Sequence, residues 1–259
     1  MSECILIERD GPIATVVLNR PDKLNAMTKD MWRRLGEAMT ELSADDRLRC
    51  LVLRGAGGKS FSPGNDISEF ETERSNPSQA KAYGTILHQA LTAVKTCRHP
   101  TVALIEGICV GGGLEVAALC DLRICGESSR FGVPINRLGL VMAYPEIDGL
   151  RRLVGPAVAL EILLEGRVFA AAEAKDKGLV TRIVADDRVA AEAYETAGRI
   201  AAGAPLVARW HKRFLRRLED PAPLGEAELD EGYACFGTED FRIGYRAFLA
   251  KTTPQFKGR

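Results

Sequence analysis

The feature that most constrains this chain is the stretch TVALIEGICVGGGLEVAALCD at residues 101–121. A β-rich apolar run is broken at Gly107, and three consecutive glycines at 111–113 precede a second short apolar run. This pattern predicts a strand, a tight turn and a helix. Because residues 114–120 carry no polar side chain other than Glu115, we expect the helix to be buried on most sides, with that carboxylate inside the protein.

The glycines and the carboxylate together indicate a functional site. A buried carboxylate is unfavourable unless it is paired, hydrogen-bonded or kept neutral, and such perturbed groups are common at functional sites. N–H groups at a helix N-terminus are unsatisfied donors, and glycine lets a ligand oxygen approach them closely. Gly112 and Glu115 are three residues apart and can serve one pocket. The alternative is a turn required for packing, with Glu115 paired to an arginine elsewhere.

Composition limits the class of protein. A chain of 259 residues with 46% apolar and 27% charged residues fits a soluble globular protein with a substantial core. Lysine plus arginine equal aspartate plus glutamate at 35 each, so we expect no nucleic-acid or membrane partner. The seven cysteines include no zinc-type C-x-x-C pair, and the N-terminus does not resemble a signal peptide. Free thiols in a reducing compartment, the cytoplasm, are therefore expected.

Hydrophobic periodicity predicts strand, strand, helix repeats up to Val184 and helices beyond. Strands are expected at 5–9, 13–19, 50–54, 101–105, 122–125 and 180–184, the first two forming a hairpin. The expected helices follow Thr28 and then lie at 78–97, 145–153, 156–165, 171–177, 188–202, 205–218, 226–236 and 238–251. We therefore expect an α/β layered core over residues 1–200 and a helical region over 201–259 that covers the core or packs on another subunit.

Several common sites are excluded by spacing. Residues 53–60 resemble a phosphate-binding loop but lack its first glycine, and Val116 stands where the last glycine of a dinucleotide fingerprint belongs. No serine lies in a G-x-S-x-G turn. We expect no metal site, because no histidine has a spaced partner among His88, His99 and His211.

Taken together, the motifs resemble the crotonase, or enoyl-CoA hydratase/isomerase, superfamily. The matching stretches are NRPDKLNA at 19–26, FSPGNDI at 61–67, IEGICVGGGLE at 105–115 and YRAFLAK at 245–251. The resemblance covers Ile5 to about Lys257 and implies a crotonase-like spiral of repeated ββα units with a C-terminal helical extension. It also implies an enoyl-CoA hydratase-like enzyme, assembled as trimers or hexamers, whose acyl-CoA substrate brings the CoA so that no separate cofactor is needed.

The resemblance assigns roles to individual residues. The thioester carbonyl would bind between the backbone N–H groups of Asn65 and Gly112, which stabilise a developing enolate oxygen. Glu115 matches one of the two glutamates with which hydratases hold water and move its proton. The implied acyl-CoA contacts, the last two often from a neighbouring subunit, are Lys23, Asn25, Ala26, Asn65, Asp66, Ile67, Ser68, Gly112, Ile135, Tyr144, Phe248 and Lys251.

One acid of the family is missing, because its second glutamate falls at Ile135. Candidate substitutes are Asn136, Tyr144, Glu146 and Asp148, although acids in the first turn of a helix need no catalytic explanation. Three reactions that share the enolate stay open: hydration or its reverse, double-bond migration with one base, and decarboxylation. A non-catalytic, RNA-binding member of the family is a more remote alternative, against which the balanced charge argues.

Overall fold

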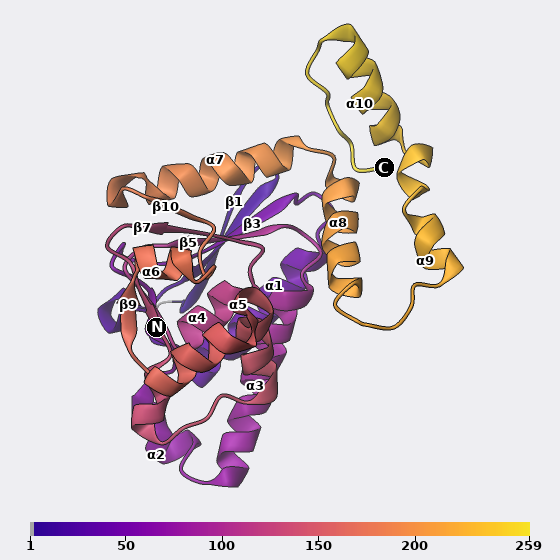
Figure 1. Ribbon diagram of the computed structural model, residues 1–259. Coiled ribbons are helices and arrows are strands. Elements are labelled where there is room, and N and C mark those ends of the chain that lie inside the picture. The colour runs from indigo at the N-terminus through magenta and orange to yellow at the C-terminus, as the bar shows by residue number, and fades with distance from the viewer. Residues whose placement is uncertain (1–2) are drawn as a thin grey trace.

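The structure, a computed structural model, describes residues 3–259 and is built on two sheets (Figure 1). The six-stranded sheet contains, in spatial order, β1 (Ile5–Asp10), β2 (Ile13–Leu18), β3 (Cys50–Gly55), β5 (Thr101–Ile105), β7 (Leu122–Gly126) and β10 (Arg182–Val184). The four-stranded sheet contains β4 (Ser60–Ser62), β6 (Ile108–Val110), β8 (Arg130–Gly132) and β9 (Val168–Ala170).

Each turn of the chain gives one strand to each sheet. The hairpin β1–β2 is antiparallel, whereas β2, β3, β5, β7 and β10 pair in parallel. After β4 come α2 (Phe70–Glu73) and α3 (Pro77–Thr96), after β6 comes α4 (Gly112–Leu119), and after β8 comes α5 (Tyr144–Glu165). The predicted strand, strand, helix repeat is therefore confirmed. The second sheet itself was not predicted, because strands of three residues are too short to show a period.

The larger sheet is covered on both faces, which explains why its central parallel strands are mostly apolar and buried. Helix α7 (Val189–Ala202) lies along one face, and α1 (Lys29–Ala44), α3 and α4 lie on the other (Figure 1). Alternate side chains of β3 follow this division. Cys50 and Val52 pack with α7, while Leu51 and Leu53 enter the main core.

Helix α4 is buried as predicted, from Gly112 to Ala117. Its C-terminal end is closed by Arg123, which is 6% exposed and donates to the carbonyls of Ala117 at 3.3 Å and Leu179 at 2.8 Å. A cation at the negative end of the helix dipole is stabilising, and it satisfies carbonyls that would otherwise lack donors. The N-terminal end of α4 is the part left to meet a ligand.

The C-terminal part of the chain is helical, as predicted. Helix α5 contains the two expected helices, joined across a kink at Gly155, and α6 (Ala171–Asp176) follows β9. Helix α8 (Pro205–Arg217) lies against the core, while α9 (Glu226–Glu231) and α10 (Glu239–Ala250) extend away from both sheets (Figure 1). The helix expected over 226–236 is wrong in length, because α9 stops before Gly232 and a 3₁₀ turn follows at Ala234–Gly237. The strand expected at 180–184 likewise begins only at Arg182.

None of the helices within residues 3–259 combines the length and the apolar character that crossing a bilayer requires.

Candidate active site

The loop that follows β4 meets the N-terminus of α4. Met27 holds this loop in place, since its N–H donates to the Gly64 carbonyl at 2.8 Å and its carbonyl accepts from Asp66 N–H at 2.9 Å. Gly64 has φ +102°, and a Cβ added there would lie 2.8 Å from the nitrogen of Gly112. Only glycine permits that contact. The close approach brings the backbone of Asn65 beside that of Gly112, as the resemblance implied.

Trp32 fixes both of these residues. Its indole Nε1–H donates to Asn65 Oδ1 at 2.7 Å, and a Cβ added to Gly112 would lie 3.0 Å from the indole ring. The hydroxyl of Tyr83 lies 3.5 Å from the same Asn65 oxygen and 3.1 Å from Glu69 Oε2. The side chain of Asn65 is thus occupied inside the protein. Among residues 3–259, the backbone N–H groups of Asn65 and Gly112 have no hydrogen-bond acceptor.

Glu115 lies one turn into α4 and is 9% exposed. Its Oε2 is buried without a hydrogen-bond partner, and no ion pair in the described part of the chain includes this residue. Burial and, to a smaller extent, the negative charge of Glu146 raise the pKa of its carboxyl to about 8, although the charge of Arg74 opposes the shift. At pH 7 this carboxyl is therefore mainly neutral. The packing alternative required Glu115 to pair with an arginine, and residues 3–259 contain no such pair.

Glu146 is the acid that approaches Glu115 from α5. Its Oε2 accepts from the Ala143 N–H at 2.8 Å, and its Oε1 lies 2.8 Å from His88 Nε2. These contacts hold the carboxylate in place, and its charge acts on Glu115. Of the four candidate substitutes for the missing acid, it is the one whose charge reaches the site.

The other candidates are directed elsewhere. Tyr144 is 92% exposed, and the Asn136 amide donates to the Leu164 carbonyl at 2.9 Å. Asp148 is bound by Lys95 at 3.2 Å, Arg151 at 3.0 Å and Arg152 at 2.6 Å, and these cations lower its pKa. Ile135, at the position of the family's second glutamate, packs against the main core.

The residues expected to meet the CoA moiety divide into two groups. Lys23, Ala26, Asp66, Ile67 and Ser68 lie on the loops beside Asn65, with Ile67 56% exposed and Lys23 and Ser68 also exposed. The Asn25 side chain is fully used within the protein, binding Arg20 N–H at 3.0 Å and the carbonyls of Ala56 at 3.0 Å and Ser60 at 2.8 Å.

Phe248 and Lys251 form the second group, at the end of α10. Phe248 is 82% exposed, and Figure 1 shows α10 far from α4 within one chain. Their predicted contact with CoA therefore needs a second copy of the chain.

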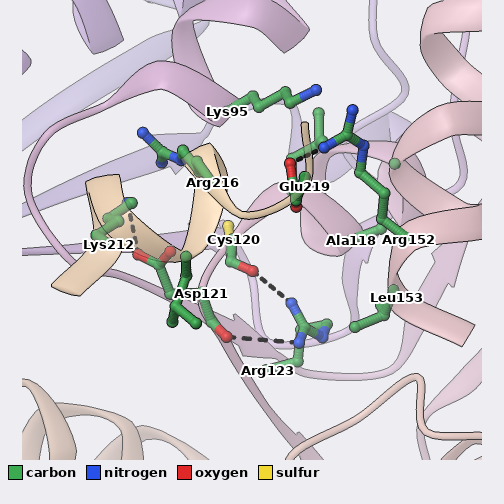
Figure 2. Close-up of a pocket in the computed structure, with 13 residues that line it drawn as sticks. Lys95, Ala118, Cys120, Asp121, Arg123, Arg152, Leu153, Lys212, Arg216 and Glu219 are labelled. Atoms are coloured by element: carbon green, nitrogen blue, oxygen red, sulfur yellow. Dashed lines mark hydrogen bonds and ion pairs between the residues drawn. The ribbon is translucent and has the colours of Figure 1, made fainter. Parts of the chain in front are cut away.

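A separate cavity lies at the opposite, C-terminal end of α4 (Figure 2). Figure 2 shows Lys212 directed at Asp121, with Nζ and Oδ2 2.5 Å apart, and Arg152 directed at Glu219. The charged side chains of this cavity are held by ion pairs or by backbone carbonyls, and none of the predicted catalytic residues lines it. Elsewhere in residues 3–259, no three histidine, cysteine, aspartate or glutamate side chains form a metal-binding group.

Comparison with known proteins agrees with this geometry. The family model for Enoyl-CoA hydratase/isomerase matches residues 8–259. A probable enoyl-CoA hydratase of Mycobacterium tuberculosis is 34% identical over 99% of both chains, and a short-chain-enoyl-CoA hydratase of Clostridium acetobutylicum is 31% identical over 98% of both. The crystal structure of an enoyl-CoA hydratase/carnithine racemase from Magnetospirillum magneticum superimposes with a TM-score of 0.98 at 53% identity, covering 100% of this chain and 97% of that one.

Sequence, fold and relatives thus agree over almost the entire length, and the chain belongs to the enoyl-CoA hydratase/isomerase family of the crotonase superfamily, whose members transform acyl-CoA thioesters.

Proposed function

We propose that this enzyme hydrates an enoyl-CoA through a thioester enolate, with the Asn65 and Gly112 N–H groups as its oxyanion hole and Glu115 as proton donor. The observation that carries the proposal is the convergence of two unpartnered backbone donors beside a buried neutral carboxyl. Fixed donors aimed at a developing oxyanion act most strongly where water is excluded, and one such donor contributes about 3 kcal/mol.

The proton balance of hydration requires two groups. Attack of water at C3 forms a C–O bond and moves the electron pair of the double bond onto the thioester oxygen. Water must lose a proton and C2 must gain one. Neutral Glu115 donates to C2, while the Glu146 carboxylate, with His88 beside it, accepts the proton of water. Return of that proton from Glu146 to Glu115 completes the cycle, so no redox or metal cofactor is required by this chemistry.

A panel of thioesters tests the reaction. The protein is incubated with crotonyl-CoA, a β,γ-enoyl-CoA and malonyl-CoA, and the products are read by mass. Gain of one water by crotonyl-CoA, abolished in Glu115→Gln, is expected. A moved double bond without mass change would assign the isomerase alternative, and loss of CO₂ without dependence on Glu115 would assign the decarboxylase alternative. If every ester returns unchanged, acyl-CoA catalysis of this kind is excluded.

The RNA-binding alternative is tested separately. The equal numbers of acidic and basic residues, 35 each, give no general attraction for a polyanion. We expect no salt-sensitive shift in the electrophoretic mobility of RNA, whereas a shift that weakens steeply with salt would support this alternative.

The same proposal includes assembly through α9 and α10 into trimers or hexamers. Exposed aromatic rings follow one another there, with Phe236 and Phe241 centred 4.8 Å apart and Phe241 and Tyr245 5.3 Å apart. Burying such a patch on a second copy is favourable, and would also bring Phe248 and Lys251 to a neighbour's CoA. Light scattering measures the mass directly, and a monomer would contradict the proposal. The seven free cysteines, five of them buried, support a reducing, cytoplasmic location.

A further inference from the structure

Arg74, the residue that follows α2, is a cation without an anionic partner in the described part of the chain. No side-chain hydrogen bond or ion pair within residues 3–259 includes its guanidinium, and its Nη1 is buried without a partner. The guanidinium carbon lies 4.8 Å from the ring centre of Phe70 and 4.8 Å from that of Tyr83. An unpaired buried N–H group is unfavourable, so an acceptor at this position would stabilise the protein.

This guanidinium lies beside a residue that contacts the proposed site. The Tyr83 ring on which it stacks carries the hydroxyl 3.5 Å from Asn65 Oδ1, so one tyrosine side chain separates Arg74 from the proposed oxyanion hole. The charge of Arg74 also acts on Glu115, although no ion pair joins the two side chains. Arg74 Nη1 and Glu115 Oε2 are both buried without a hydrogen-bond partner.

The geometry is suited to binding a carboxylate. Contact with two rings restrains the guanidinium, and the Arg74 backbone N–H donates to the Phe70 carbonyl at 3.2 Å, which fixes the backbone. A fixed planar guanidinium binds a carboxylate through two parallel hydrogen bonds and loses little conformational entropy in doing so. The same group disfavours an acyl chain that is cationic.

We infer that Arg74 selects acyl groups that carry a carboxylate remote from the thioester, so that the substrates are CoA monothioesters of short unsaturated dicarboxylic acids. The inference rests on the proposed function, because it places the thioester at Asn65 and Gly112. Arg74 is a specificity residue in this account and takes no part in proton transfer.

Two other roles for Arg74 make different predictions. If its charge only offsets the carboxyl groups of Glu115 and Glu146, its removal alters turnover of every ester equally. If Arg74 binds a phosphate of CoA, its removal weakens the binding of every ester equally. Only selection of the acyl group changes the ratio of the kcat/KM values for an anionic and a neutral substrate.

The test compares the CoA monothioester of pent-2-enedioic acid with neutral pent-2-enoyl-CoA, using the intact protein, Arg74→Met and Arg74→Lys. We expect the unsubstituted enzyme to have the higher kcat/KM with the dicarboxylic ester. Arg74→Met should lower that value about 10- to 100-fold and change the neutral ester less than about threefold, since a hydrogen bond to a charged group has this strength. Arg74→Lys should give an intermediate loss. The control is Arg188→Met, at an exposed arginine that pairs with Glu195 at 3.5 Å.

A preference for the neutral ester, or an equal loss with both esters in Arg74→Met, would overturn the inference. Binding measured by calorimetry separates it from the proposed function. If neither ester is hydrated but the dicarboxylic ester binds tighter in an Arg74-dependent way, only the proposed reaction is wrong. If hydration proceeds without discrimination, only the role of Arg74 is wrong.

Discussion

The indole N–H of Trp32 reaches Asn65 Oδ1 across 2.7 Å, and this hydrogen bond joins α1 to the loop that supplies half of the proposed oxyanion hole. Trp32 is completely buried, and its ring lies 3.0 Å from the place that a Cβ on Gly112, the other half, would occupy. One side chain therefore sets the spacing of two backbone donors that come from separate turns of the chain.

Trp32→Phe removes the donor and keeps most of the packing. Asn65 Oδ1 would then retain only the Tyr83 hydroxyl at 3.5 Å, and an undersatisfied buried acceptor destabilises by about 1–3 kcal/mol. Because the loop is less firmly held, we expect kcat with an enoyl-CoA to fall about 10- to 100-fold. Steady-state kinetics and urea unfolding measure the two effects. The control is Trp210→Phe, at the second tryptophan, which lies on α8. Equal kinetic losses in both variants would show that the effect is not specific to Asn65.

The neighbouring glycines should differ in their response to alanine. A Cβ on Gly113 would lie 2.2 Å from the Ser62 carbonyl oxygen, which is fixed backbone, so Gly113→Ala should destabilise by about 3 kcal/mol or more. A Cβ on Gly112 would lie 3.0 Å from the Trp32 ring, which can shift slightly. Gly112→Ala should therefore fold but lose activity at least about tenfold, because Trp32 positions Asn65. Thermal unfolding and steady-state kinetics of the two variants measure the two effects. The reverse order of stability would contradict this packing.

The long elements and the central site motif could be predicted because their sequences are locally complete. Residues 101–121 contain the strand, the glycines and the buried acid within one stretch, and the structure places all three as expected. The residues that organise the site could not be found in this way. Trp32, Tyr83 and His88 lie on the buried or half-buried faces of α1 and α3, where a core residue and a site residue have the same periodicity.

The roles of Glu146 and Asp148 also could not be distinguished from the sequence, although the two residues are close together in the chain. Both lie in the first turns of α5, and helix-dipole chemistry explains either one. They differ only in what other elements bring to them: His88 from α3 for Glu146, and a lysine with two arginines for Asp148. Such distinctions depend on tertiary packing, which no local pattern contains.

Glu146→Gln removes the proposed acceptor of the water proton, so we expect kcat to fall steeply, and the residual activity should show a changed pH dependence. Removing the negative charge that faces Glu115 lowers the pKa of that carboxyl from about 8. If Glu115 must be protonated to act, activity disappears as pH rises through its pKa, so the alkaline limb of kcat/KM should move to lower pH in this variant. Asp148→Asn, two residues away, should leave the limb in place, because the Asp148 charge is not a cause of the Glu115 shift. An unmoved limb in Glu146→Gln would remove Glu146 from the site.

Glu115 should also make stability depend on pH in a defined window. The unfolded chain loses this proton near pH 4.5, whereas the folded protein keeps it up to about pH 8. Between these values the native state binds the extra proton, so the free energy of unfolding contributed by Glu115 falls with rising pH, by about 1.4 kcal/mol per pH unit, and is constant above and below. Glu115→Gln cannot titrate. We therefore expect it to gain stability relative to the unsubstituted protein from pH 5 to pH 8, measured by urea unfolding at each pH, while Glu226→Gln at an exposed position gains none. A constant difference between Glu115→Gln and the unsubstituted protein across this window would mean that Glu115 is already ionised near pH 5, and neutral Glu115 could not then be the proton donor.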